Sequence, residues 1–296
     1  MRESWAVDDP IGPASHPFGD ACTTALISRH HNVVTRALVD GDGPVPVPEG
    51  REGNFAARDH NNRGQLAPHD VAFTALCVAH SYGVMHYSEM LSFLRSLPEV
   101  PRWGPVVGLD LGCGIGSALL ALRAAVGESP DHRWMGFDAN GATLAIARDL
   151  FAGLAGPRPR WVTALDEAVL DQVALWALEG RRLVVTASHL FGQQSLTSTA
   201  IEDLARQIGD LVTITGSIEL VGIEPDRSGV VERGPQFLAE LGRWTRAEAR
   251  VDEVRELLRL ETRSTAPIPP MVGPCRKRVR WYSLGPARPA SAPLTP

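Results

Sequence analysis

The sequence predicts an α/β fold: a doubly wound, mostly parallel seven-stranded sheet with helices on both faces and an N-terminal helical extension. From Val106 onward, short apolar runs alternate with stretches of helical periodicity, which is typical of a parallel sheet flanked by helices. A glycine-rich turn joins the first apolar run to a helix rich in Ala and Leu. At 296 residues the chain is long enough for one large domain and a small accessory region.

Composition divides the chain into four segments. Residues 1–66 are rich in Gly, Pro, Asp and Asn, which predicts an arm that is only partly regular. Apolar residues at helical spacing over 67–104 predict a helical region that precedes the main domain. The main domain is expected over 105–286. The Pro- and Ala-rich stretch 287–296 is expected to be a disordered tail.

Within the main domain each element follows from a change of periodicity. Strands are expected, in chain order, at 106–111, 133–138, 160–164, 182–187, 218–223 and 278–284. Helices are expected at 117–126, 142–154, 167–178, 200–208 and around 237–244. In the fourth of these helices, Thr199 and Glu202 have the spacing of a capping box. The stretch between the last helix and the last strand has no pattern that assigns it.

Composition and charge restrict the possible functions. No apolar run approaches the roughly 20 residues that span a bilayer, and the first residues lack the apolar stretch of a signal peptide. We therefore expect a soluble, cytoplasmic protein without a membrane partner. The four cysteines are far apart, so neither a metal site nor a disulfide framework is expected. A formal net charge of -5 argues against strong nonspecific attraction to nucleic acid.

The turn after the first strand reads DLGCGIG and carries the chemistry. Glycine permits positive φ and close approach of a ligand to the backbone, and the start of a helix offers N–H groups. A dinucleotide fingerprint would need Gly or Ala at position 117, where Ser117 stands. A phosphate-binding P-loop would need a Lys-Ser or Lys-Thr pair after the glycines. The spacing that the sequence does have is DxGxGxG.

This LDLGCGIG segment resembles the first motif of class I methyltransferases that depend on S-adenosylmethionine (SAM). The resemblance implies that SAM is the cofactor and that the loop packs on its amino-acid and ribose portions. It implies that the residues of this loop bind SAM, namely Asp110, Gly112, Cys113, Gly114 and Gly116.

Three later positions match further features of the same family. Asp138, in RWMGFDAN and followed by Ala139, ends the second strand, where the resemblance implies an acid that accepts hydrogen bonds from both ribose hydroxyls. Asp166 follows the third strand and is the candidate for the adenine amino group; as a plain structural residue it would cap the next helix. Ser188, after the fourth strand, is expected beside the transferable methyl group.

Three side chains are candidates for catalysis. His189 follows the fourth strand, at the edge where strand ends face ligands, and an imidazole can remove a proton near neutral pH. Tyr82 and His86 are four residues apart, on one face of a helix that precedes the main domain. The resemblance implies that the helical region 67–104 serves as a lid over the substrate. The alternative is that the three side chains are packing residues without a chemical role.

The leading hypothesis is therefore a SAM-dependent methyltransferase that modifies an O or N atom of a small-molecule acceptor. An RNA methyltransferase is the first alternative, because the order of elements, including the IEP sequence after the fifth strand, is similar to that of a ribosomal small-subunit methyltransferase-like family. Residues 276–282 form a basic and aromatic stretch that suits RNA, although a strand with exposed arginines has the same pattern. A regulatory protein that binds SAM without turnover is the second, and an oxidoreductase the third. Residues 186–189 lack the Asn/Asp-Pro-Pro-aromatic motif of DNA amino methyltransferases. The oligomeric state stays open.

Overall fold

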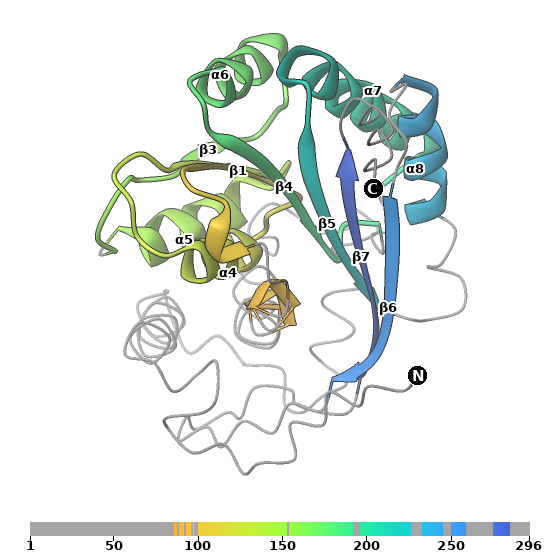
Figure 1. Cartoon of the computed structure of the whole chain (residues 1–296), viewed down its shortest axis with the longest axis horizontal. Coiled ribbons are helices and arrows are strands. Elements are labelled where there is room, and N and C mark those ends of the chain that lie inside the picture. The colour runs from red at the N-terminus through yellow and green to blue at the C-terminus, as the bar shows by residue number, and fades with distance from the viewer. Residues whose placement is uncertain are drawn as a thin grey trace, which may run out of the picture.

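The structure is a computed structural model of the whole chain (Figure 1). The residues that it describes are 86–87, 89–91, 93–95, 97, 100–152, 154–191, 196–225, 233–244, 250–258 and 275–284. The predicted arm at 1–66 and the predicted tail at 287–296 lie outside the described residues. So does the segment 67–85, which holds the first part of the predicted lid.

A mostly parallel sheet organises the chain, in the order β3-β2-β1-β4-β5-β7-β6. The first strand, β1 (Val106–Leu111), lies between β2 (Arg133–Phe137) and β4 (Arg182–Ser188), and both neighbours run parallel to it. Beyond them, β3 (Arg160–Val162) and β5 (Ile218–Pro225) extend the parallel part at its two sides. The order reverses between β1 and β4, and open α/β sheets bind ligands at such a point.

Two antiparallel strands complete the sheet. The last strand of the chain, β7 (Cys275–Leu284), pairs with β5, and β6 (Arg250–Leu258) pairs with β7 at the edge. The periodicity of the sequence did not assign β6. Its apolar residues, which include Val251, Val254 and Leu258, recur every three or four positions as in a helix. Pairing with β7 overrides that local pattern, since backbone hydrogen bonds along a whole strand outweigh weak propensity.

Helices cover both faces of the sheet, as a doubly wound fold requires (Figure 1). They are α4 (Ser117–Val126), α5 (Gly141–Phe151), α6 (Glu167–Leu178), α7 (Ser198–Thr215) and α8 (Arg233–Trp244), with a 3-10 turn at Val100–Arg102. One apolar core joins α6, α7 and α8 to one face, and a second core joins α4 and α5 to the other. Among the described residues no helix combines the length and apolarity needed to cross a membrane.

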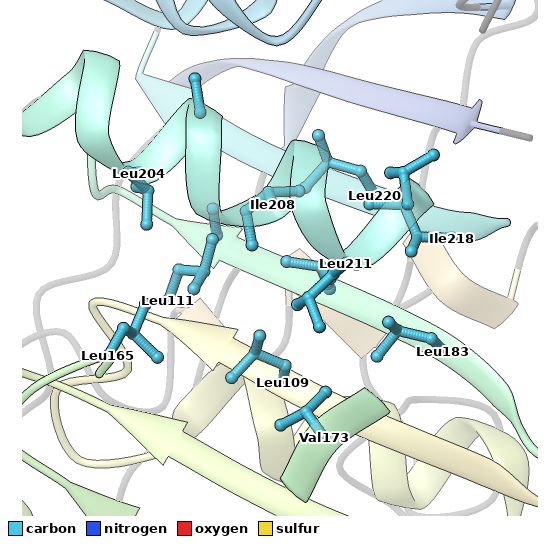
Figure 2. Packing of buried hydrophobic residues seen from close by; sticks show 14 of the residues in the cluster. Leu109, Leu111, Leu165, Val173, Leu183, Leu204, Ile208, Leu211, Ile218 and Leu220 are labelled. Atoms are coloured by element: carbon cyan, nitrogen blue, oxygen red, sulfur yellow. The ribbon is translucent and has the colours of Figure 1, made fainter. Parts of the chain in front are cut away.

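Alternation along β1 explains why there are two cores. Val107, Leu109 and Leu111 point into the first core, where Figure 2 shows two of them with leucines of β4 and α7. Val106 belongs to the second core instead, because successive side chains of a strand face opposite sides. All six residues of β1 are buried, so the strand is central to the sheet.

Described residues between 86 and 95 are helical and form what is called here the N-terminal helix, and the apolar ones among them pack in the second core. Met90, Leu91 and Leu94 are fully buried there, in one cluster with Val221 and Ile223 of β5. This part of the predicted 67–104 region therefore packs on the sheet, on the same face as α4.

Several element ends differ from those expected. The capping box at Thr199 and Glu202 was wrong: α7 begins at Ser198, and its N-cap is Thr197, whose hydroxyl accepts a hydrogen bond from the N–H of Ala200. The helix also continues to Thr215, because its apolar stripe runs on through Leu211 and Val212. It ends at Gly216, which adopts the left-handed conformation.

Candidate functional site

Register brings three segments to one edge of the sheet. Leu111 of β1 is paired with Phe137 of β2 and with Ala187 of β4, so the residues that follow these strands emerge side by side. They are the glycine loop 112–116, Asp138 and the segment 188–190. Parallel strands place their carboxyl ends at the same edge, which is where α/β proteins build sites.

The three glycines of the loop have positive φ, but their surroundings differ. A Cβ added at Gly116 would lie 2.8 Å from the Trp161 ring and 2.9 Å from Phe151, and one added at Gly112 would lie 2.6 Å from Leu190 Cδ1. At Gly114 no heavy atom of the described residues comes within 4 Å of that position. Gly112 and Gly116 thus fit against the protein, whereas the described residues leave space at Gly114 that a ligand can fill.

Asp138 joins the second strand to this loop. Its Oδ2 accepts a hydrogen bond of 2.8 Å from the N–H of Gly114, and its Oδ1 accepts one of 2.8 Å from the N–H of Asn140. Burial raises the pKa of this carboxyl above its ordinary value, and the hydrogen bonds from the two N–H groups and from the Thr143 side chain oppose the rise. Ala139, the next residue, is exposed. The carboxylate therefore borders the same open space as Gly114.

Asp110 lies behind the loop, inside the protein. It is 1% exposed, and its two oxygens accept hydrogen bonds from the Thr186 hydroxyl at 2.8 Å and from the N–H of Leu119 at 3.2 Å. Burial raises its pKa to about 7. The carboxylate so ties β1 to β4 and to the first turn of α4, which fixes the loop between them. Thr186 was not among the residues expected at the site.

Cys113 contributes to the loop through its backbone. Its N–H donates a hydrogen bond of 2.8 Å to the Phe137 carbonyl, which fastens the loop to β2. The side chain is 7% exposed, and burial raises the pKa of the thiol well above its ordinary value. A buried, protonated thiol is a small apolar group, so the side chain is not a nucleophile.

The segment after β4 lies against the glycine loop through Leu190, which covers Gly112. His189 has φ of 58°, the only positive value for a non-glycine among the described residues, and its N–H donates a hydrogen bond of 2.7 Å to the Ile223 carbonyl. Such a conformation is costly for a side chain larger than glycine and recurs at functional sites. The Ser188 hydroxyl oxygen is buried, and no described residue forms a hydrogen bond with it.

His189 contacts the N-terminal helix, on which the sequence candidate His86 lies. The two imidazole rings stack, with centroids 3.9 Å apart and planes 12° from parallel. The Nε2 of His189 also lies 3.1 Å from Oε2 of Glu89, a carboxylate that is 1% exposed. Glu89 was missed at the sequence level. Its spacing of three residues from His86 on one helix face could have indicated it, once His86 was a candidate.

Two further residues, Asp166 and Tyr82, were also predicted at the site. Asp166 is exposed and caps α6, since its side chain accepts a hydrogen bond of 2.9 Å from the N–H of Val169. This is the structural alternative that the sequence also allowed. Tyr82 lies outside the described residues, so its relation to His86 stays a prediction.

Metal binding and the basic stretch complete the comparison with the sequence. Within the part of the chain that the structure describes, no three His, Cys, Asp or Glu side chains are grouped to hold a metal ion. The basic stretch 276–282 forms part of β7, between β5 and β6. It is therefore a strand inside the sheet, in keeping with the structural reading of its pattern.

Comparisons with known proteins give similarity of fold alone. No protein-family profile matches the sequence, and no curated protein matches it. Magnesium protoporphyrin IX methyltransferase from Synechocystis PCC 6803, solved with bound SAM, is 13% identical, with 80% of this chain and 99% of that chain covered and a TM-score of 0.42. A SAM-dependent methyltransferase from Aquifex aeolicus is 11% identical, with 74% of this chain and 99% of that chain covered and a TM-score of 0.41. The 16S rRNA methylase ArmA is 16% identical, with 78% of this chain and 97% of that chain covered and a TM-score of 0.39. All three TM-scores lie below 0.5, so these likenesses assign no function to this chain.

Proposed function

We propose that this protein is a SAM-dependent methyltransferase that transfers a methyl group to an O or N atom of a small-molecule acceptor. The observation that carries the proposal is the hydrogen bond from Gly114 to Asp138. It joins the glycine loop after β1 to an acid after β2 at one edge of the sheet, beside open space at Gly114.

The residues present fit this cofactor. A carboxylate has about four lone-pair positions, and Asp138 uses three of them for the N–H groups of Gly114 and Asn140 and the Thr143 side chain, which leaves capacity for a ribose hydroxyl. The glycine loop brings backbone to the same space without a Cβ at Gly114. The start of α4, directly after the loop, favours the carboxylate of the methionine portion. Bound there, SAM would supply an electrophilic methyl group on a sulfonium.

The acceptor is expected beside the segment after β4. Leu190 brings this segment against the glycine loop, and the buried Ser188 hydroxyl and the His189 ring lie next to Leu190 in the chain. Methyl transfer needs an aligned nucleophile and, for a hydroxyl or ammonium acceptor, a group that takes its proton. We assign that second task to His189, with His86 and Tyr82 as residues that shape the acceptor site.

Calorimetric titration of SAM and of its demethylated product, S-adenosylhomocysteine (SAH), tests the cofactor. We expect micromolar binding to the wild type and a loss of about tenfold or more in Asp138→Asn, because an amide nitrogen cannot accept the N–H of Gly114 or a ribose hydroxyl. Asp171→Asn, an exposed acid on α6, is the matched control and should bind normally. Absence of binding to folded wild type would refute the proposal.

The acceptor class is tested separately by RNA binding. The net charge of -5 favours a small molecule, since RNA binding relies on cation contacts with phosphates. We expect no salt-dependent binding of a structured RNA to the SAH-saturated protein. Binding that weakens steeply as salt rises would instead favour an RNA acceptor.

A further inference from the structure

Two residues of one helix hold the His189 ring from different sides. His86 stacks on the face of the ring, and Glu89 meets its Nε2 edge at 3.1 Å. They are three residues apart, so one face of the N-terminal helix presents both. The ring is thus constrained in its plane and in its rotation by a helix about one hundred residues away in the chain.

The environment of Glu89 makes this contact unusual for a packing residue. Its side chain is 1% exposed, and its neighbours Met90 and Leu91 belong to the apolar core. A buried carboxylate is costly unless it is paired, and an apolar residue at position 89 would suit the core better. The pairing with His189, whose side chain is 14% exposed, gives this carboxylate a partner at the edge of the sheet where the proposed acceptor binds.

We propose that Glu89 is the positioning residue of a catalytic histidine: it holds the proton of His189 on Nε2 and so makes Nδ1 the atom that accepts the proton of the methyl acceptor. This inference rests on the proposed function and deepens it. It names the acceptor class as a hydroxyl or ammonium compound, in which the nucleophilic atom carries a proton that must leave.

Methyl transfer then needs only the acceptor, SAM and the His189 imidazole. The acceptor loses its proton to Nδ1 of His189 while its O or N atom forms a bond to the methyl carbon. The carbon–sulfur bond breaks, and its electron pair stays on sulfur, which becomes a neutral thioether. The imidazolium that forms is stabilised by the Glu89 carboxylate, because an opposite charge at this distance favours the charged form of the ring.

Nitrogen-15 NMR of the SAH-saturated protein, with labelled histidine and His189 assigned through His189→Gln, tests the proton arrangement. In the wild type, at a pH where the ring is neutral, we expect the Nε2 shift of a protonated nitrogen and the Nδ1 shift of an unprotonated one. The reverse pair of shifts in this spectrum would overturn the proposal.

Variants then measure what Glu89 does to the ring. Among the described residues, Glu89 and His86 are titratable side chains in contact with it. In Glu89→Gln we expect the His189 titration midpoint to fall by about one pH unit or more, since a paired carboxylate is lost. Glu219→Gln is the matched control, because Glu219 is a buried carboxylate paired with Arg182. An unchanged midpoint in Glu89→Gln would contradict the inference.

Turnover separates positioning from mere structural support. A panel of hydroxyl and amine compounds, assayed with methyl-labelled SAM, should contain an acceptor for which Glu89→Gln lowers kcat at least tenfold and moves the acidic limb of the pH profile to lower pH. The SAM dissociation constant should stay the same. Equal kcat and pH profiles in wild type and Glu89→Gln would refute the role of Glu89. If the wild type does not bind SAM, that result would instead refute the proposed function.

Discussion

At the scale of single residues, the loop shows that two glycines with positive φ can have different surroundings. Gly114 and Gly116 both have positive φ, yet Gly116 fits against Trp161 and Phe151 whereas Gly114 faces open space. The motif pattern treats them alike, because sequence spacing carries no information about what surrounds a residue. Stability and ligand binding should therefore separate when each glycine is replaced.

Alanine at these two positions tests the distinction. Gly116→Ala should lower the free energy of unfolding by about 3 kcal/mol, because its Cβ meets core rings and the backbone is strained. Gly114→Ala should cost only about 1 kcal/mol of stability, from strain, but should weaken SAM binding at least tenfold. Urea unfolding and calorimetry measure both. Equal stability losses in the two variants would show that Gly114 is also packed against protein.

At the scale of elements, helix ends depend on one hydrogen bond rather than on a motif. The spacing of Thr199 and Glu202 fits a capping box, but Thr197 occupies the N-cap and bonds to Ala200. Only Thr199 has a glutamate three residues later, but a threonine hydroxyl at either position can accept a backbone N–H, and packing of the apolar stripe on the sheet selects Thr197. The same competition explains β6, whose helical spacing yields to pairing with β7.

Substitution of each threonine discriminates between the two caps. Thr197→Ala should destabilise the protein by about 1 kcal/mol, because the N–H of Ala200 loses its acceptor. Thr199→Ala, the matched control on the first turn, should change stability by less than about 0.5 kcal/mol. Chemical unfolding of both variants under one set of conditions measures the difference. A larger loss in Thr199→Ala would restore the capping box.

At the scale of the whole molecule, Asp110 links local burial to global stability. Its pKa is raised from 3.8 to about 7, so between these values the folded protein holds a proton that the unfolded chain releases. The contribution of Asp110 to stability is therefore full below pH 3.8, declines as the pH rises, and is lost above about 7. The ionised carboxylate is the costly form, because it is fully buried.

Asp110→Asn should remove this dependence. The amide keeps an acceptor for the Leu119 N–H and a donor for Thr186, while it cannot ionise. We expect the variant to gain stability relative to the wild type by roughly 4 kcal/mol at most between pH 4 and pH 8. Urea unfolding at several pH values measures this. A stability difference that is the same at all pH values would show that Asp110 titrates alike in both states.

Much of the fold and part of the site could be predicted from local patterns. The strand, loop and helix over 106–126 and the position of Asp138 follow from periodicities of two and 3.6 residues and from a glycine spacing, all of which act between near neighbours. His189 and His86 were named from their positions alone, without any sign that their rings would stack.

The sequence by itself determined the alternation of strands and helices from Val106 onward, the glycine loop and the position of Asp138 at the end of the second strand. Each of these depends on the pattern within one short segment of the chain. Only the tertiary structure decided that Asp110 pairs with Thr186 and that Glu89 holds His189. These partners are 76 and 100 residues apart. Contacts of that range form only when strands pair and helices pack, and a pattern within one segment cannot encode which distant segment will meet it.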